Sequence, residues 1–386
     1  MIDETDAGVQ SAAHDLIALS HSIHSEPELA FEEHRSAAKV CESLREHGFE
    51  VETGVADIAT AFTGTFGSGE LVVGICAEYD ALPEIGHACG HNIIAASAVG
   101  AALALAPLAD TLGITVKVLG TPAEESGGGK VLMLERGVFD GIAAALMVHP
   151  GPFDIVSATS LALSDVAVEF TGRAAHASAA PEWGINAGDA VTISQVAIGL
   201  LRQHLAPDQQ LHGIVSDGGL APNIVPGHAE LLYYLRAHSS ESLDALTAKT
   251  FACFEAGAIA TGCTHSIRTV SPTYAELRPD PWLAATYRRE AEALGRTPLA
   301  PELEGFRPLG STDMGNVTHV LPGIHPVIGL DSHGAVTHQP EFAAACITES
   351  ADNAVLDGAK LLARTVIRAS QDDAVRARLL DGVAAR

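Results

Sequence analysis

The chain has 386 residues, of which 47% are hydrophobic and 18% charged, so it carries enough apolar surface to fold and is not an extensively disordered protein. Its 22 lysines and arginines against 48 aspartates and glutamates give a formal net charge of −26, which excludes nucleic acids and anionic membrane surfaces as expected partners. Six cysteines without a paired spacing indicate reduced thiols, and an acidic N-terminus without a secretory signal adds to the prediction of a cytoplasmic protein.

Helical patterns and apolar runs alternate through the first part of the chain. Amphipathic helices are predicted around residues 16–23 and 37–44. Apolar runs bounded by turn residues follow at 71–77, 114–120 and 142–148, with helical stretches at 93–109 and about 128–137. The stretch 93–109 is shorter than the ~20 residues needed to cross a bilayer, so we expect a buried core helix there. Strands that alternate with helices predict a mainly parallel sheet.

The pattern changes near residue 161. Val166, Val168 and Phe170 alternate as in a half-exposed strand, and a helical pattern ends at Leu201. Signals like those of the first part resume at Pro281, with an apolar run at 325–330 and a long helix after Pro340. We therefore predict a two-domain α/β protein. Residues 1–160 and 275–386 form the larger domain, and residues 161–274 form a smaller inserted α+β domain.

Residues that can bind a metal follow the predicted strands. They are Asp80 after the first run, Glu124 and Glu125 after the second, His149 after the third, and Asp331, His333 and His338 after the fourth, with Cys89 and His91 in between. The carboxyl ends of parallel strands share one sheet edge, where ligands bind. Thiolate, imidazole and carboxylate are the donors of zinc-like ions, so we expect a metal site. The dipole of the next helix would favour a Cys89 thiolate.

The two adjacent glutamates can have different functions. Neighbouring residues in an extended loop point in different directions, so one of Glu124 and Glu125 can bind a metal while the other transfers a proton. The pattern alone leaves open that the pair only marks the acidic first turn of a helix. The glycines 127–129 before Lys130 lack the spacing of a phosphate-binding loop and predict a turn.

Five segments carry a resemblance that runs through nearly the whole chain. They read AEYDALPEIGHACGHN, GTPAEESGGGK, FTGRAAHASAAP, GSTDMGNV and THQPEF. In this order they resemble the two-metal aminoacylase/carboxypeptidase family of amidohydrolases. They most resemble its aminoacylase-1-like subgroup, which includes p-aminobenzoyl-glutamate and β-alanyl-dipeptide hydrolases. The resemblance implies a catalytic domain and an inserted lid that forms a homodimer.

The resemblance also implies a role for each site residue. Two divalent ions, zinc or manganese and alternatively cobalt, would be held by Cys89 as the bridge and by His91, Glu125, His149 and His338. Glu124 would be the general base and Asp80 would orient a ligand. His176 would stabilise the oxyanion in the partner subunit's active site, and Asn223 and Arg236 would hold the substrate.

Three positions leave details of this site open. Asn92 and Glu78 stand where the family pattern has aspartate. His333 competes with His338 as a ligand, and His338 is preferred because it precedes a Pro-x-Phe helix start, as the family pattern requires.

The predicted function is metal-dependent hydrolysis of an amide bond in a small molecule. N-acyl amino acids, aminobenzoyl-glutamate-like conjugates and small dipeptides are the expected substrates. One alternative is a thiol amidase with Cys89 as nucleophile and His91 as base, which the clustered ligands disfavour. Another is a catalytically silent binding protein, which the intact Glu124 and Glu125 pair disfavours.

Overall fold

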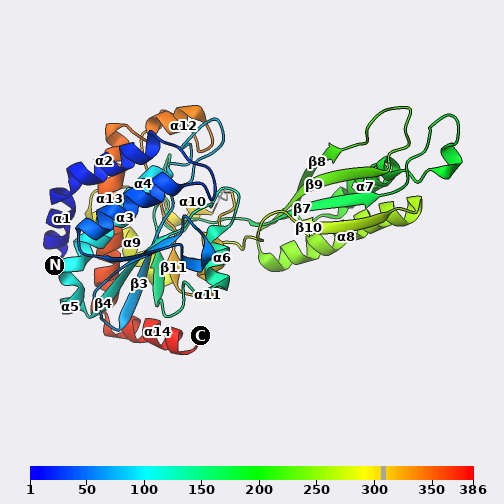
Figure 1. Cartoon of the computed structure of the whole chain (residues 1–386). Helices are drawn as coiled ribbons and strands as arrows, with labels where there is room; N and C mark the ends of the chain where they lie inside the picture. Colours follow the sequence, from blue (N-terminus) through cyan, green and yellow to red (C-terminus); the bar gives the residue numbers. More distant parts are fainter. Residues whose placement is uncertain (306–309) are drawn as a thin grey trace. The chain divides into compact units, whose positions relative to one another are not determined.

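The chain leaves one folded unit after Thr159 and returns to it at Leu277. The computed structural model describes residues 1–305 and 310–386 and divides them into two units (Figure 1). Unit 1 comprises Met1–Thr159 and Leu277–Arg386, and unit 2 comprises Ser160–Glu276. The inserted segment therefore begins one residue before the expected 161 and ends two residues after the expected 274.

Unit 1 is built on a six-stranded sheet of order β1-β2-β4-β3-β5-β11. The strands are β1 (Glu50–Thr53), β2 (Phe62–Phe66), β3 (Leu71–Ala77), β4 (Ile114–Gly120), β5 (Ala144–Leu146) and β11 (Gly323–Ile324). Strands β4, β3, β5 and β11 run parallel, and β1 and β2 add an antiparallel edge. A separate parallel pair joins β6 (His149–Gly151) to β12 (Val327–Gly329). The predicted α/β class with a mainly parallel sheet is confirmed.

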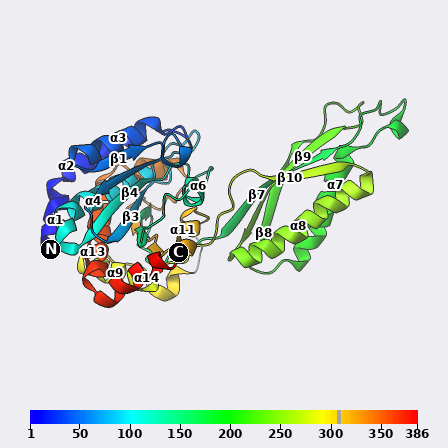
Figure 2. The same cartoon turned by 60° about the horizontal axis from the view of Figure 1, so that its bottom comes forward.

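Helices cover both faces of this sheet (Figure 2). They are α1 (Ile2–Ser11), α2 (Ala13–His24), α3 (His34–Glu46), α4 (His91–Leu105), α5 (Ala109–Leu112), α6 (Gly129–Glu135), α9 (Pro281–Ala293), α10 (Pro301–Glu304), α11 (Met314–Val320), α12 (Pro340–Ala345), α13 (Glu349–Gln371) and α14 (Asp373–Ala384). Alternate residues of β3 point to opposite faces, so Val73 packs in one core and Cys76 in another. Burial on both faces explains the continuous apolar run of this strand.

Two predicted helical segments have different bounds in the structure. The segment His91–Leu112 is apolar and long enough to cross a membrane, but 89% of its most apolar window is buried inside the protein, so it is a core element. The long helix expected after Pro340 is α13 (Glu349–Gln371), and the short α12 (Pro340–Ala345) precedes it. Helix α12 ends at Ala345, and α13 starts anew because the Thr348 side chain accepts a hydrogen bond from the Ala351 N–H and caps it.

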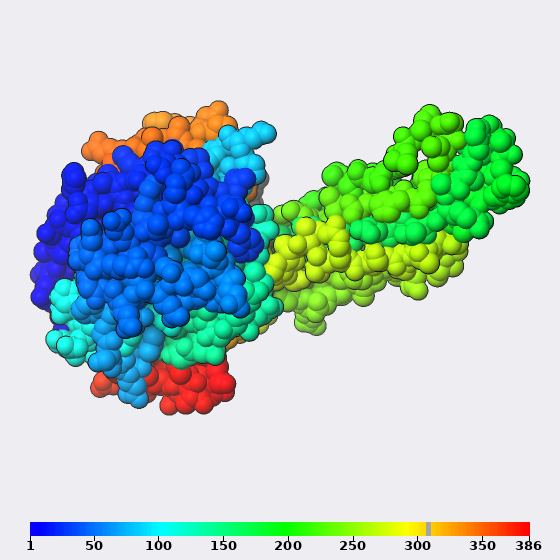
Figure 3. Space-filling model, in the orientation of Figure 1, coloured from blue at the N-terminus to red at the C-terminus, as the bar shows by residue number. Residues whose placement is uncertain are grey.

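The N-terminal segment, in blue, covers most of the face of unit 1 seen in Figure 3.

Unit 2 is a four-stranded antiparallel sheet of order β10-β7-β9-β8 with two helices packed on one face (Figure 1). Its elements are β7 (Ala162–Thr171), α7 (Ala187–Leu201), β8 (Gln210–Asp217), β9 (His228–Ala237), α8 (Ser240–Thr261) and β10 (Thr264–Thr269). Val166, Val168 and Phe170 lie in the core between sheet and helices, which explains their alternation. Strand β8 is an edge strand.

Candidate metal centre

The predicted ligands of unit 1 come together in two groups of three. One group is Cys89, His91 and His149, and the other is Cys89, Glu125 and His338. Within each group the candidate ligand atoms all lie within 4.8 Å of one another. Cys89 belongs to both groups, which is the arrangement of two ions that share one ligand.

A glycine between two of these ligands fixes the local backbone. Gly90 has φ 76° and is the N-cap of α4, so His91 is the first residue of the helix. A Cβ atom at Gly90 would lie 2.5 Å from Pro150 Cγ and 3.0 Å from Cys346 Sγ. Only glycine combines the left-handed conformation with this close packing. The turn therefore brings Cys89 and His91 to the same edge of the sheet.

Asp80 contacts one residue from each group. Its Oδ1 is 2.8 Å from His91 Nδ1, and its Oδ2 accepts a hydrogen bond from the Glu125 backbone N–H at 2.9 Å. Because Nδ1 of His91 is engaged, Nε2 is the nitrogen left to bind a cation. A carboxylate behind a ligating histidine fixes its tautomer and ring orientation.

The two other histidines differ in exposure. His149 Nδ1 is 2.7 Å from the Pro150 carbonyl oxygen, and burial lowers the pKa of His149 to about 4, which keeps the ring in the neutral form that binds metals. The His338 side chain is 57% exposed, with Nε2 3.5 Å from Glu125 Oε2. His333 belongs to neither group. Its side chain is 85% exposed, with Nδ1 3.2 Å from Asp331 Oδ1.

The adjacent glutamates separate as predicted from their positions in a loop. Glu124 forms a third group with Glu78 and His91, whereas Glu125 lies with Cys89 and His338. The pair precedes α6, which begins only at Gly129, so it is not the first turn of a helix. Burial, together with the charges of Glu78 and Glu125, raises the pKa of Glu124 well above its usual range. This makes Glu124 a stronger base than an exposed carboxylate.

A strained residue precedes the pair. Ala123 has φ 60°, a conformation that is uncommon for a residue with a Cβ atom. Its N–H donates to Oε1 of the buried Glu33 at 2.9 Å, and its carbonyl accepts from the Gly127 and Gly128 N–H groups. Glu33 thus holds the backbone directly before Glu124. Glu33 was not predicted from the sequence, because its position 90 residues away carries no local signal.

The prediction that the helix dipole favours a Cys89 thiolate is wrong for the protein without a cation. Burial raises the pKa of Cys89 well above its usual range, and the carboxylates of Glu125 and Glu124 add to the effect. A cysteine nucleophile needs a lowered pKa, so this environment disfavours the thiol amidase alternative. A divalent cation is the partner that would favour the thiolate here.

The side chains present fit divalent ions. Among the described residues, His91 Nε2, Glu125 Oε1 and Glu78 Oε2 are buried without a hydrogen-bond partner. Such atoms are costly unless a cation or water satisfies them. A thiol, imidazoles and carboxylates around them form the donor set of zinc and its neighbours in the first transition series.

A buried ion pair beside this centre was also not predicted from the sequence. Lys130 was expected to follow a turn, and the turn exists, but its ammonium lies buried between Glu78 and Asp313. Lysine is almost never fully buried, so nothing in the sequence pattern pointed to this location.

The remaining predicted residues belong to unit 2. His176 and Asn223 lie on adjacent exposed segments, and the Ala177 N–H donates to the Asn223 carbonyl at 3.0 Å. His176 Nδ1 accepts from the Ser178 and Ala179 N–H groups, so Nε2 carries the proton of the neutral ring. Arg236 is the next-to-last residue of β9, and its guanidinium carbon is 5.5 Å from the Tyr234 ring centre.

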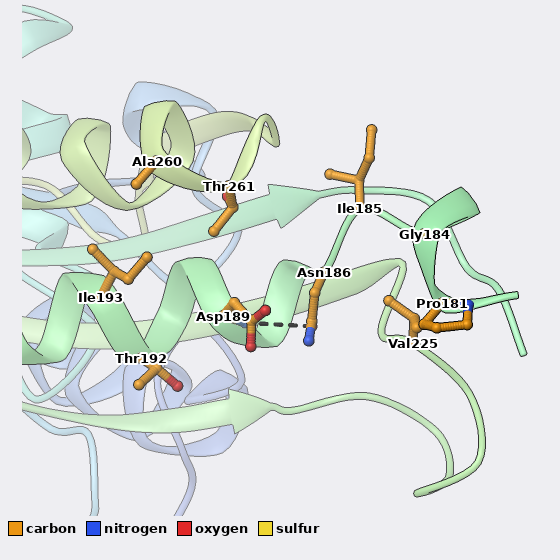
Figure 4. Close-up of a pocket in the computed structure, with 10 residues that line it drawn as sticks. All are labelled: Pro181, Gly184, Ile185, Asn186, Asp189, Thr192, Ile193, Val225, Ala260 and Thr261. Carbon is orange, nitrogen blue, oxygen red and sulfur yellow. Dashed lines mark hydrogen bonds between the residues drawn. The ribbon is translucent and has the colours of Figure 1, made fainter. Parts of the chain in front are cut away.

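Two cavities are lined entirely by residues of unit 2. One, of about 570 Å³, lies between the start of α7 and the end of α8 (Figure 4). Its only ionisable lining residue is Asp189, whose N–H donates to Asn186 Oδ1 at 3.3 Å. The other, of about 610 Å³, is lined by His176, Arg173 and Trp183 among others. The two donor groups that share Cys89 therefore lie in unit 1, and none of their residues lines the first cavity.

Comparison with known proteins places this geometry in a family. Residues 74–368 match the model of peptidase family M20/M25/M40. The chain is 39% identical to the Xaa-Arg dipeptidase of Mus musculus over an alignment of 396 positions, gaps included. The alignment covers 97% of this chain and 89% of that protein. It is 34% identical over 271 residues to one of the subunits of p-aminobenzoyl-glutamate hydrolase from Escherichia coli, covering 65% of this chain and 56% of that protein.

A solved structure supports the fold. The YXEP protein of Bacillus subtilis, described as a dinuclear metal binding peptidase from the M20 family, superposes with a TM-score of 0.70 at 21% identity, covering 93% of this chain and 98% of that one. The chain therefore belongs to peptidase family M20/M25/M40 and is a metal-dependent hydrolase of amide bonds.

Proposed function

We propose that this chain is a dipeptidase that cleaves dipeptides with a C-terminal arginine at a centre of two divalent ions. The observation that carries the proposal is the pair of donor groups that share Cys89, with Glu124 beside them. The substrate class rests on the 39% identity to an Xaa-Arg dipeptidase over nearly the whole chain. The formal net charge of −26 also favours a cationic substrate.

Cys89, His91 and His149 would hold one ion, and Cys89, Glu125 and His338 the other. When bound, the ions supply Lewis acidity that polarises the scissile carbonyl and lowers the pKa of the attacking water. Zinc suits the thiol and imidazole donors, and manganese or cobalt are the alternatives.

Glu124 would accept the proton of the attacking water and return it to the leaving amine. Its environment supports this role, since burial and two neighbouring carboxylates make it more basic than an exposed glutamate. Asp80 would keep His91 and Glu125 in position through its two hydrogen bonds.

His176 would donate a hydrogen bond from Nε2 to the oxyanion, and Arg236 and Asn223 would bind the carboxylate and backbone of the substrate. The stretch of β9 from His228 to Arg236 spans about 27 Å at roughly 3.4 Å per residue, so Arg236 and His176 occupy opposite ends of unit 2. One copy of unit 2 cannot present both ends to one scissile bond. A homodimer, in which the partner subunit supplies one end, resolves this separation.

Strand β8 supports unit 2 as the dimer contact. It is an edge strand, and Ile214 and Val215 on it are 62% and 43% exposed. Unpaired edge strands with exposed apolar residues are sites of pairing between chains. We further propose a cytoplasmic location, which the six free cysteines support.

A substrate panel tests the proposed function. Purified protein loaded with zinc, manganese or cobalt is assayed with alanyl-arginine, alanyl-glutamate, p-aminobenzoyl-glutamate and N-acetyl-alanine. We expect the largest kcat/KM for alanyl-arginine. A preference for p-aminobenzoyl-glutamate would refute the dipeptidase assignment while leaving amide hydrolysis intact.

A further inference from the structure

Buried carboxylates hold the backbone on both sides of Glu124, the proposed general base. The Ala123 N–H donates to Glu33 Oε1 at 2.9 Å. The Glu125 N–H donates to Asp80 Oδ2, also at 2.9 Å. Both carboxylates are buried in unit 1. Glu124 therefore lies on a short stretch of chain that is fixed before and after it.

The two carboxylates differ in what else they contact. Asp80 Oδ1 is 2.8 Å from His91 Nδ1, so a change at Asp80 disturbs a metal donor directly. Glu33 belongs to none of the donor groups found among the described residues, and the backbone that it holds is that of Ala123, which has no donor side chain. A change at Glu33 should therefore reach the base without reaching the ions.

The hydrogen bond from Ala123 to Glu33 stabilises an unfavourable backbone conformation. Ala123 has φ 60°, and a residue with a Cβ atom keeps such a conformation only where its surroundings impose it. Its carbonyl accepts from the Gly127 and Gly128 N–H groups at 3.0 and 2.8 Å. Without Glu33, the Ala123 N–H would be buried and unpaired, which favours relaxation to an ordinary φ. Because Glu124 follows directly, that relaxation changes the direction of its side chain.

A second contact joins the segment of Glu33 to the same loop. A Cβ atom at Gly127 would lie 2.4 Å from Phe31 Cε2 and 2.8 Å from Ala123 Cβ, so the ring of Phe31 packs directly on the loop. Phe31 is two residues before Glu33, which immediately precedes α3. Residues 31–33 therefore support the loop through an aromatic ring as well as a carboxylate.

We propose that Glu33 is a positioning residue for the reaction and keeps Glu124 in place through the backbone of Ala123. The inference rests on the proposed role of Glu124 as general base, and it does not depend on which small amide the protein cleaves best. A displacement of about 1 Å at a reacting group costs on the order of 10²-fold in rate. Loss of the hydrogen bond should therefore lower kcat while both ions stay bound.

Three variants of Glu33 measure this effect. Zinc-loaded wild type, E33A, E33D and E33Q are assayed with the substrate that wild type cleaves best, and bound zinc per chain is measured at buffered free zinc. E33A removes the acceptor and E33D retracts it, so kcat should fall about 10–100-fold, with little change in KM and with wild-type zinc content. E33Q keeps an oxygen for the Ala123 N–H and should recover most of kcat.

The double variant E33A/E124Q shows whether Glu33 acts through Glu124. E33A should lower kcat in the wild-type background but not in the E124Q background, because residues that act as a unit are not additive. An equal loss in both backgrounds, or wild-type kcat in E33A, would overturn the inference. E33D replaces E33A in each comparison if E33A does not fold. Wild-type kcat in E124Q would instead refute the proposed general base.

Asp280→Ala is the matched control for general damage to the fold. Asp280 is another buried carboxylate of unit 1 that holds backbone, because its Oδ1 accepts from the Trp282 and Leu283 N–H groups at 3.1 and 3.0 Å. This variant should lower the free energy of unfolding and keep the kcat of wild type. A fall in kcat as large as that of E33A would overturn the inference, since lost stability would then explain both variants.

Discussion

The carboxylate of Asp80 lies 2.8 Å from Nδ1 of His91, and both side chains are fully buried. The other carboxylate oxygen holds the backbone of Glu125, so one residue orients a donor in each of the two groups. The metal centre therefore depends on a residue that does not itself belong to either donor group.

Asp80→Ala tests this dependence. The change frees the His91 ring and the Glu125 backbone, so the affinity for zinc should fall by about 10–100-fold. Zinc bound per chain at buffered free zinc measures the effect. Asp352→Ala is the matched control, because Asp352 holds His21 at 2.7 Å elsewhere in unit 1. Equal zinc affinity in the Asp80 variant and in wild type would show that the contact does not support metal binding.

Glu124→Gln tests the general base. The amide keeps the shape of the side chain but cannot accept the proton, so kcat should fall by about 10²–10⁴-fold. Zinc content should not change, since Glu124 is outside the two groups that share Cys89. Glu125→Gln provides the comparison and should lose metal. The roles of the pair would be reversed if the Glu124 variant lost its ions and the Glu125 variant kept them.

Glu33 gives a pH dependence to the stability of the metal-free protein. Burial and the nearby Asp80 raise the pKa of Glu33 to about 7 from its ordinary value of 4.5. The folded state therefore binds the proton more tightly than the unfolded state, and the free energy of unfolding falls as the pH rises from about 4.5 to about 7. This group accounts for a decrease of up to about 3 kcal/mol.

Glu33→Gln removes that titration and keeps the acceptor for the Ala123 N–H. Urea unfolding of the metal-free proteins at pH 5 and pH 8 should show a smaller loss of stability for the variant than for wild type. An identical loss in both proteins would mean that Glu33 ionises with an ordinary pKa.

Much of the centre could be predicted because it follows from topology. Residues 71–77 and 114–120 are strands with the expected bounds, and parallel strands bring their carboxyl ends to one edge. The residues that follow these two strands therefore lie close together, whatever conformation the loops adopt. They are Asp80, Glu124 and Glu125. Gly90 between Cys89 and His91 was a visible local signal of a tight turn.

Contacts between distant segments could not be predicted in the same way. Lys130 and Asp313 are 183 residues apart, and their pairing depends on how α6 and the segment before α11 pack. Helix α1 was missed because the sequence MIDETDAGVQ has only a weak apolar stripe, with Val9 buried against the core. The antiparallel strands β1 and β2 were missed because they are short and β1 is largely exposed.

His176 tests the shared active site. His176→Ala should lower kcat and leave zinc content unchanged, because the residue belongs to unit 2 and to neither donor group. Mixing this variant with Glu124→Gln should restore activity, since mixed dimers contain one site with both wild-type residues. Subunit exchange is verified with differently tagged chains. Absence of recovery in proven mixed dimers would contradict a site built from two subunits.

Metal removal tests whether the reaction depends on the two ions. The protein is treated with a chelator, desalted, and assayed with alanyl-arginine before and after addition of zinc, manganese or cobalt, and Cys89 is alkylated in a parallel sample. We predict that the stripped protein is inactive and that activity returns as the second ion per chain is bound. Full activity of the metal-free protein, abolished by alkylation of Cys89, would contradict the two-metal account and favour a cysteine nucleophile.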